Sequence, residues 1–119
     1  MRNIDRIDNF LRLLGEEWKR QGQDLRFTQF LFNNGIDNLA SMSMYSIEEN
    51  ELLQKHFPNI NPREYLYWGT YGKNGDQPLK YKLIKDLDTD HIKAILETQP
   101  HINDLYKLTF ENELQLRNA

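Results

Sequence analysis

The sequence predicts an α+β fold that is mainly helical, with about five helices packed around a single antiparallel β-hairpin. Two runs with alternating side chains, about 65–72 and 78–85, flank the dipeptide Asn74-Gly75. This dipeptide is a strong hairpin signal, because both of its residues tolerate positive φ. Elsewhere, apolar residues recur at three- and four-residue steps, a spacing that is typical of helices that bury one face.

A turn centred on Asn74-Gly75 predicts which side chains share each face of the hairpin. One face would be aliphatic and aromatic, and we assign it to the core: Leu66, Trp68, Thr70, Leu79, Tyr81 and Leu83. The other would carry tyrosines beside lysines: Tyr65, Tyr67, Gly69, Tyr71, Lys80, Lys82 and Ile84. Pro78 has no N–H group, which favours a four-residue loop at 73–76 and an unpaired outer edge on the second strand.

The first helix is predicted to begin after Asn3 as its N-cap and to end at about 20–22. Its apolar stripe has helical spacing: Ile4, Ile7, Leu11, Leu14 and Trp18. A tryptophan in register with aliphatic residues is typical of a core side chain rather than of a binding site.

Two shorter helices are expected next. Asp24 would cap a helix at 25–34 that ends before Gly35, and its many aromatic residues favour burial over an interface. Residues 36–45 show no period and are predicted to form a loop. Ser46 and Glu49 have capping-box spacing and would open a third helix.

Two further helices follow the hairpin. Asp88 or Thr89 would cap the first, with Ile92, Ile95 and Leu96 on its apolar side. Gln99 would cap the second, which places Pro100 at its first position and runs to about residue 117.

The chain has 119 residues, which predicts a single domain at 1–119, with a helical part at 1–60 and the hairpin and C-terminal helices at 61–119. It has no cysteine, so a disulfide scaffold and thiolate zinc sites are excluded. The net charge of −3 argues against a generally basic nucleic-acid binder. No signal peptide or membrane span is expected, and a cytoplasmic location follows by default.

No catalytic constellation stands out. The three histidines, His56, His91 and His101, lack the spacing of metal ligands, although Asp88 and Asp90 lie beside His91. The repeated glycines of the hairpin do not open a helix, so they do not form a phosphate-binding loop. No serine has an assignable histidine and acid partner. We therefore expect no enzyme activity, no metal and no cofactor.

The tyrosine and lysine face of the hairpin is the best candidate for a binding site. Aromatic platforms interleaved with cations hold single-stranded nucleic acid in many proteins. In the alternative, a helix covers this face and the lysines extend to solvent. The candidate residues are Tyr65, Tyr67, Tyr71, Lys73, Lys80 and Lys82.

Two stretches carry a family resemblance. RID…W…DLRFTQFL, running into MYSIEENELL, resembles small uncharacterised helical proteins of bacteria and phages. YWGTYGKNGDQPLKY with TDHIKAILETQ resembles a segment of uncharacterised phage and prophage proteins. The resemblance implies a small accessory protein of a mobile element. The leading hypothesis is a non-catalytic protein that binds a host or phage protein; the alternative is a nucleic-acid-binding protein.

Overall fold

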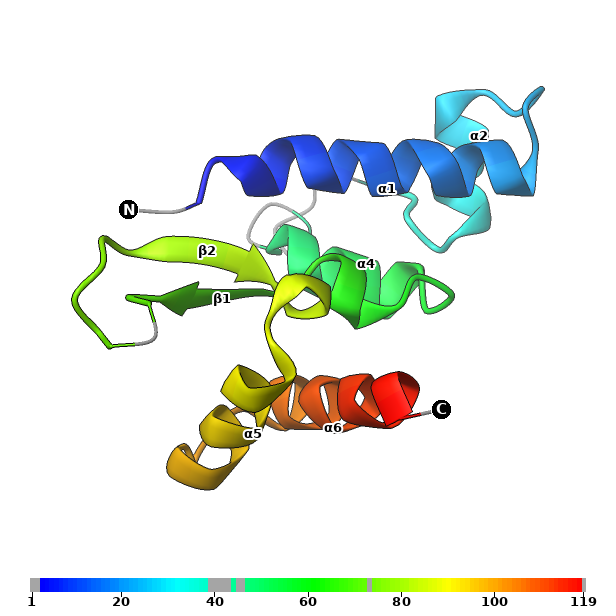
Figure 1. The fold of residues 1–119 in the computed structure, drawn as a ribbon. Coiled ribbons are helices and arrows are strands. Elements are labelled where there is room, and N and C mark those ends of the chain that lie inside the picture. The colour runs from blue at the N-terminus through cyan, green and yellow to red at the C-terminus, as the bar shows by residue number, and fades with distance from the viewer. Residues whose placement is uncertain (1–2, 39–43, 45–46, 73, 119) are drawn as a thin grey trace. The chain divides into compact units, whose positions relative to one another are not determined.

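A computed structural model describes residues 3–38, 44, 47–72 and 74–118. The chain divides into two compact units, Met1–Asn61 and Pro62–Ala119. This division lies close to the predicted one at 60/61, and the single domain stays a prediction. The mainly helical α+β fold with one antiparallel hairpin is confirmed (Figure 1).

The first unit contains the helices α1 (Asp5–Gln21), α2 (Phe27–Asn33) and α4 (Glu49–His56). The second contains the hairpin, two short 3₁₀ helices and two α-helices. In chain order these are η1 (Pro62–Glu64), β1 (Tyr67–Thr70), β2 (Lys80–Leu83), η2 (Ile84–Asp86), α5 (Thr89–Thr98) and α6 (Asp104–Asn118).

Helix α1 ends where predicted, but its N-cap is Ile4 instead of the predicted Asn3, and it buries a different side. The side chain of Asn3 accepts a hydrogen bond from the amide of Asp5, and the helix ends before Gly22. The buried residues are Leu13 and Glu17. Ile4, Ile7 and Leu11 are exposed, so the prediction that they belong to a buried stripe is wrong. The stripe is covered only at its C-terminal end, where Trp18 packs on α2.

The core of the first unit is built on aromatic rings. The ring of Trp18 is stacked on that of Phe30, with centroids 5.7 Å apart, and Phe30 contacts Phe57 at 5.5 Å. The indole N–H of Trp18 donates to the carbonyl of Leu25 at 2.9 Å. Trp18 is therefore a core residue with a satisfied polar group, as its helical register predicted.

Helix α2 is shorter and less buried than predicted. It begins at Phe27 after Arg26, not after Asp24. Phe30 and Leu31 are buried, but Phe27 and Phe32 are exposed, so the prediction that this helix buries its aromatic residues holds for one side only. Helix α2 has seven residues, about two turns, and packs one of its faces against the core.

Helix α4 follows Glu48, and the predicted cap Ser46 lies outside the described residues, as does most of the predicted loop at 36–45. Leu53 and Phe57 are buried. The end of α2 contacts the end of α4: Nδ1 of His56 lies 2.9 Å from the carbonyl oxygen of Asn34.

In the second unit, α5 packs on α6, and α6 contacts the base of the hairpin through the ring of Trp68. Its buried apolar residues are Tyr65, Leu66, Ile84, Leu87, Ile92, Ile95 and Phe110. Asp88 is the N-cap of α5, as predicted. The predicted start of α6 is wrong, because the helix begins at Asp104 and not at Pro100. The side chain of Asn103 accepts a hydrogen bond from the amide of Leu105 at 2.8 Å, the role that was predicted for Gln99.

Candidate functional site

The hairpin pairs in a register that differs by one residue from the predicted one. The facing pairs are Tyr67 with Leu83, Trp68 with Lys82, Gly69 with Tyr81 and Thr70 with Lys80. Facing residues lie on the same side of a sheet, and a shift of one residue moves each side chain of one strand to the other face. The predicted face composition is therefore wrong: Lys80 and Lys82 share a face with Trp68, and the tyrosines lie on the other face.

The loop explains the shift. It runs from residue 71 to 79 instead of 73–76, and the strands are shorter than predicted. The amide of Gln77 donates to the carbonyl of Tyr71 at 2.7 Å, and two residues, Pro78 and Leu79, then intervene before the Thr70–Lys80 pair. Pro78 has no N–H group and cannot donate a hydrogen bond to the ladder, so the chain is unpaired at this residue. Pairing begins again at Lys80, in a register that differs by one residue from the predicted one.

The turn also uses other residues than the prediction. Gly72 and Gly75 have φ of +88° and +73°, whereas Asn74 does not adopt positive φ. The amide of Gly75 donates to the carbonyl of Gly72 at 3.2 Å. The Asn74-Gly75 signal thus located the hairpin but not the centre of its turn.

One face of the hairpin, which we call the aromatic face, carries Tyr67, Tyr71, Leu79 and Tyr81 around Gly69. A Cβ atom on Gly69 would lie 3.2 Å from Cδ1 of Leu79 and 3.3 Å from Cε1 of Tyr81, so these two side chains lie over the glycine. Tyr71 directly follows Thr70, the last residue of β1, and the alternation of side chains along a strand assigns it to this face. The exposed fractions of Tyr71, Leu79 and Tyr81 are 57%, 44% and 39%. Leu79 and Tyr81 were predicted to be core residues, and this prediction is wrong.

The opposite face, which we call the lysine face, changes character along its length. At its base, Trp68 contacts the rings of Phe110 and Tyr106 on α6 edge-on, with centroids 5.4 and 5.9 Å apart. Further out, Lys80 and Lys82 are exposed. The base of this face is therefore core, and its outer half is open.

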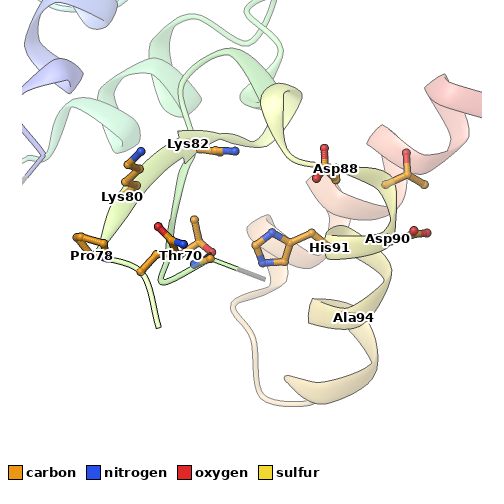
Figure 2. Close-up of a pocket in the computed structure, with 11 residues that line it drawn as sticks. Thr70, Pro78, Lys80, Lys82, Asp88, Asp90, His91 and Ala94 are labelled. Atoms are coloured by element: carbon orange, nitrogen blue, oxygen red, sulfur yellow. Dashed lines mark hydrogen bonds between the residues drawn. The ribbon is translucent and has the colours of Figure 1, made fainter. Parts of the chain in front are cut away.

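The open half borders a cavity of about 650 Å³ between the hairpin and α5 (Figure 2). Figure 2 shows the ring of His91 projecting from α5 toward the hairpin, and Lys82 extending from β2 toward α5. The hairpin contributes Thr70, Gly72, Gln77, Pro78, Lys80 and Lys82, and the start of α5 contributes Asp88, Thr89, Asp90, His91 and Ala94.

Opposite charges line the two walls of this cavity without pairing. Lys80 and Lys82 stand on the hairpin wall, and Asp88 and Asp90 on the α5 wall. Within the described part of the chain, none of the four forms an ion pair. The Asp88 carboxylate also makes no capping hydrogen bond to α5. These four groups remain available to a bound molecule.

The structure places the six predicted site residues in three different surroundings. Tyr65 is buried, with 3% of its surface exposed, and burial raises the pKa of its phenol. Tyr67 is half-buried, and its carbonyl accepts a hydrogen bond from the hydroxyl of Tyr106 at 3.3 Å. Tyr71 is exposed on the aromatic face, and Lys73 lies outside the described residues. Only Lys80 and Lys82 come together at the cavity.

The sequence reasoning missed the α5 wall as a binding element. Asp88, Asp90 and His91 were considered as metal ligands or helix caps, but their position opposite Lys82 depends on the hairpin register. No group of three or more histidine and acidic residues that could hold a metal ion occurs among the residues that the structure describes. The absence of a metal site stays a prediction for the whole chain.

Comparisons of the chain with protein-family models, curated proteins and solved structures gave no match. In the described ranges, no helix has both the length and the apolar composition needed to cross a membrane.

Proposed function

We propose that this chain is a small, non-catalytic accessory protein of a phage or other mobile element, that it is cytoplasmic, and that it acts by binding a host or phage protein. The mobile-element setting rests on the resemblance of the hairpin and α5 segments to phage and prophage proteins. The binding role rests on the surface of the hairpin.

The aromatic face carries this proposal. Tyr71, Leu79 and Tyr81 are all exposed on a face that has no charged side chain among its described residues. Exposed apolar residues are common singly, but a cluster of them marks a site of interaction. Tyrosine is also enriched at protein interfaces, where its ring packs and its hydroxyl finds a polar partner.

The register favours a protein partner over a nucleic acid. Binding of single strands combines stacking on aromatic rings with cations that follow the phosphates. Here Lys80 and Lys82 lie on the opposite face from Tyr71 and Tyr81, and they share their cavity with Asp88 and Asp90. A polyanion on the aromatic face would lack those cations, and one in the cavity would meet two carboxylates.

The test compares variants of the full chain in cross-linking capture from a host lysate. We expect Tyr71→Ser combined with Leu79→Ser to lose a specific captured protein. Leu108→Ser combined with Leu116→Ser is the matched control. These two leucines of α6 are 56% and 53% exposed, so their replacement also removes exposed apolar area. Equal capture by both double variants, or no specific protein, would contradict the proposal. Salt-sensitive binding of oligonucleotides would instead favour the nucleic-acid alternative.

A further inference from the structure

The cavity between the lysine face and α5 has the size and lining of a binding site. Its volume of about 650 Å³ lies within the ~300–1,000 Å³ range of ligand pockets. Besides its lysines and aspartates, it offers further hydrogen-bonding groups on both walls, from Thr70 and Gln77 on the hairpin and from His91 on α5. It is separate from the aromatic face, because Thr70, Lys80 and Lys82 point to the other side of the sheet.

The charges of the cavity restrict what it can hold. The charges of the two lysines on one wall and the two aspartates on the other cancel. A purely anionic molecule would be attracted by the lysines but repelled by the aspartates. A purely cationic molecule would be attracted by the aspartates but repelled by the lysines. A molecule that carries both signs pairs with both walls, and complementarity of this kind governs specificity between partners.

The spacing of the lysines matches an extended peptide. Lys80 and Lys82 are two residues apart on one strand, so their Cα atoms are separated by about 7 Å. Alternate side chains of an extended peptide have the same spacing. Its backbone N–H and C=O groups would form hydrogen bonds with the side chains of Thr70, Gln77 and His91. The charged side chains would reach the lysines on one side and the aspartates on the other.

We infer that this cavity binds an extended segment of the partner protein that carries both an acidic and a basic side chain. This inference rests on the proposed function, because it assumes a protein partner. It adds a second contact, on the lysine face, to the one on the aromatic face.

The experiment is a selection of random twelve-residue peptides displayed against the full chain, followed by affinity measurements on synthetic peptides. We expect enriched sequences to contain an acidic and a basic residue. Lys80→Gln with Lys82→Gln, and separately Asp88→Asn with Asp90→Asn, should each weaken their binding at least tenfold. Lys93→Gln with Glu97→Gln is the control, since these exposed residues of α5 do not line the cavity.

Two checks keep the outcome readable. The amide NMR spectrum of each variant shows whether it is folded. In the wild-type chain, bound peptides should shift the amide resonances of Thr70, Gln77 and His91. Replacing the peptide's acidic residue by its amide should remove the sensitivity to the lysine variants, and replacing its basic residue by glutamine should remove the sensitivity to the aspartate variants.

The other outcomes separate this inference from the proposed function. Peptides that depend on Tyr71 and Leu79 but not on the cavity charges would overturn the inference and leave the proposed function standing. Enriched peptides that are purely acidic and insensitive to the aspartate variants would also overturn it. The inference would also be overturned if an oligothymidylate bound to the chain, peptides did not, and the lysine variants no longer bound the oligothymidylate. No enrichment over a blank selection overturns the inference, and the lysate capture then decides the proposed function.

Discussion

Oε1 of Glu113 lies 2.5 Å from Nε of Arg63, and the Glu113 side chain is 1% exposed. Its Oε2 accepts hydrogen bonds from Nη2 of Arg63 at 3.1 Å and from Nε of Arg117 at 2.9 Å. Arg117 also donates to the hydroxyl of Thr89 at 3.0 Å and to the carbonyl of Lys85 at 3.2 Å. One buried carboxylate thus joins α6 to η1 directly, and through Arg117 to η2 and the start of α5. The α5 wall of the cavity is held by this network.

Replacing Glu113 by glutamine should destabilise the second unit. Removing one partner of a buried ion pair costs about 3–5 kcal/mol, because the remaining charge is left without compensation. Both arginines keep about a quarter of their side chains exposed, so water offsets part of the loss, and we expect the lower end, about 3 kcal/mol. The measurement is urea unfolding followed by the indole N–H resonance of Trp68.

The matched control for this variant is Glu111→Gln on the same helix. Glu111 is exposed, and surface substitutions of this kind change stability by about 0.5 kcal/mol or less. If Glu113→Gln were as mild as the control, the network would not contribute to the stability of the second unit.

Stability should also fall in acid through Glu113. The hydrogen bond from Arg63 lowers the pKa of this carboxyl below its usual 4.5; burial opposes the shift, and the bond from Arg117 adds to it. A carboxyl whose pKa is lower in the folded chain than in the unfolded chain stabilises the fold fully above the unfolded pKa. This contribution is lost as the pH falls through the folded pKa.

The measurement is the free energy of unfolding of the wild type and of Glu113→Gln between pH 7 and pH 2. The difference between the two should be constant above about pH 5 and shrink below the unfolded pKa of Glu113. A difference that stays constant down to pH 2 would show that the carboxylate is not what the arginines stabilise.

The loop glycines should differ in their tolerance of a side chain. Gly72 and Gly75 both have positive φ, which costs a residue with a Cβ atom about 1–2 kcal/mol. A Cβ atom at Gly72 would also overlap the side chain of Gln77, whereas no atom of the described part of the chain lies within 4 Å of one at Gly75. We expect Gly72→Ala to cost at least about 1 kcal/mol more than Gly75→Ala, because overpacking adds to the backbone strain.

Urea unfolding followed by Trp68 measures both glycine variants. Each is the control for the other, since they share the backbone cost and differ in the contact with Gln77. Equal losses would mean that the loop relaxes away from Gln77 and that only the positive φ values matter.

The sequence predicts which elements form better than it predicts how they pair. Asn74-Gly75 indicated the hairpin, and the period of Ile92 and Ile95 indicated a buried helix side, because these signals are local. The pairing register depends on how the chain passes Pro78, where several loop geometries satisfy the same local rules. One residue of difference then moved Leu79 and Tyr81 from the core to the surface.

The candidate site shows the same limit. The sequence left open whether the face with Tyr71, Lys80 and Lys82 is covered by a helix, and the structure shows these three residues exposed. Their grouping was predicted wrongly, because it depends on the register. The position of His91 across the cavity from the lysine face depends on how α5 packs on α6, which no spacing within the sequence encodes.

A last prediction concerns Gly15, in the middle of α1. Glycine in a helix interior costs about 0.5–1 kcal/mol relative to alanine, because the unfolded chain loses more freedom. Among the residues that the structure describes, and apart from the backbone of α1 itself, no atom lies within 4 Å of a Cβ atom at this position, so alanine adds no clash with them. Gly15→Ala should therefore stabilise the first unit by about 0.5–1 kcal/mol, measured by urea unfolding at the indole N–H resonance of Trp18. Gly15→Ser is the control and should fall between the two, since serine has an intermediate helix propensity. A loss of stability with alanine would show that another part of the chain packs against this side of α1.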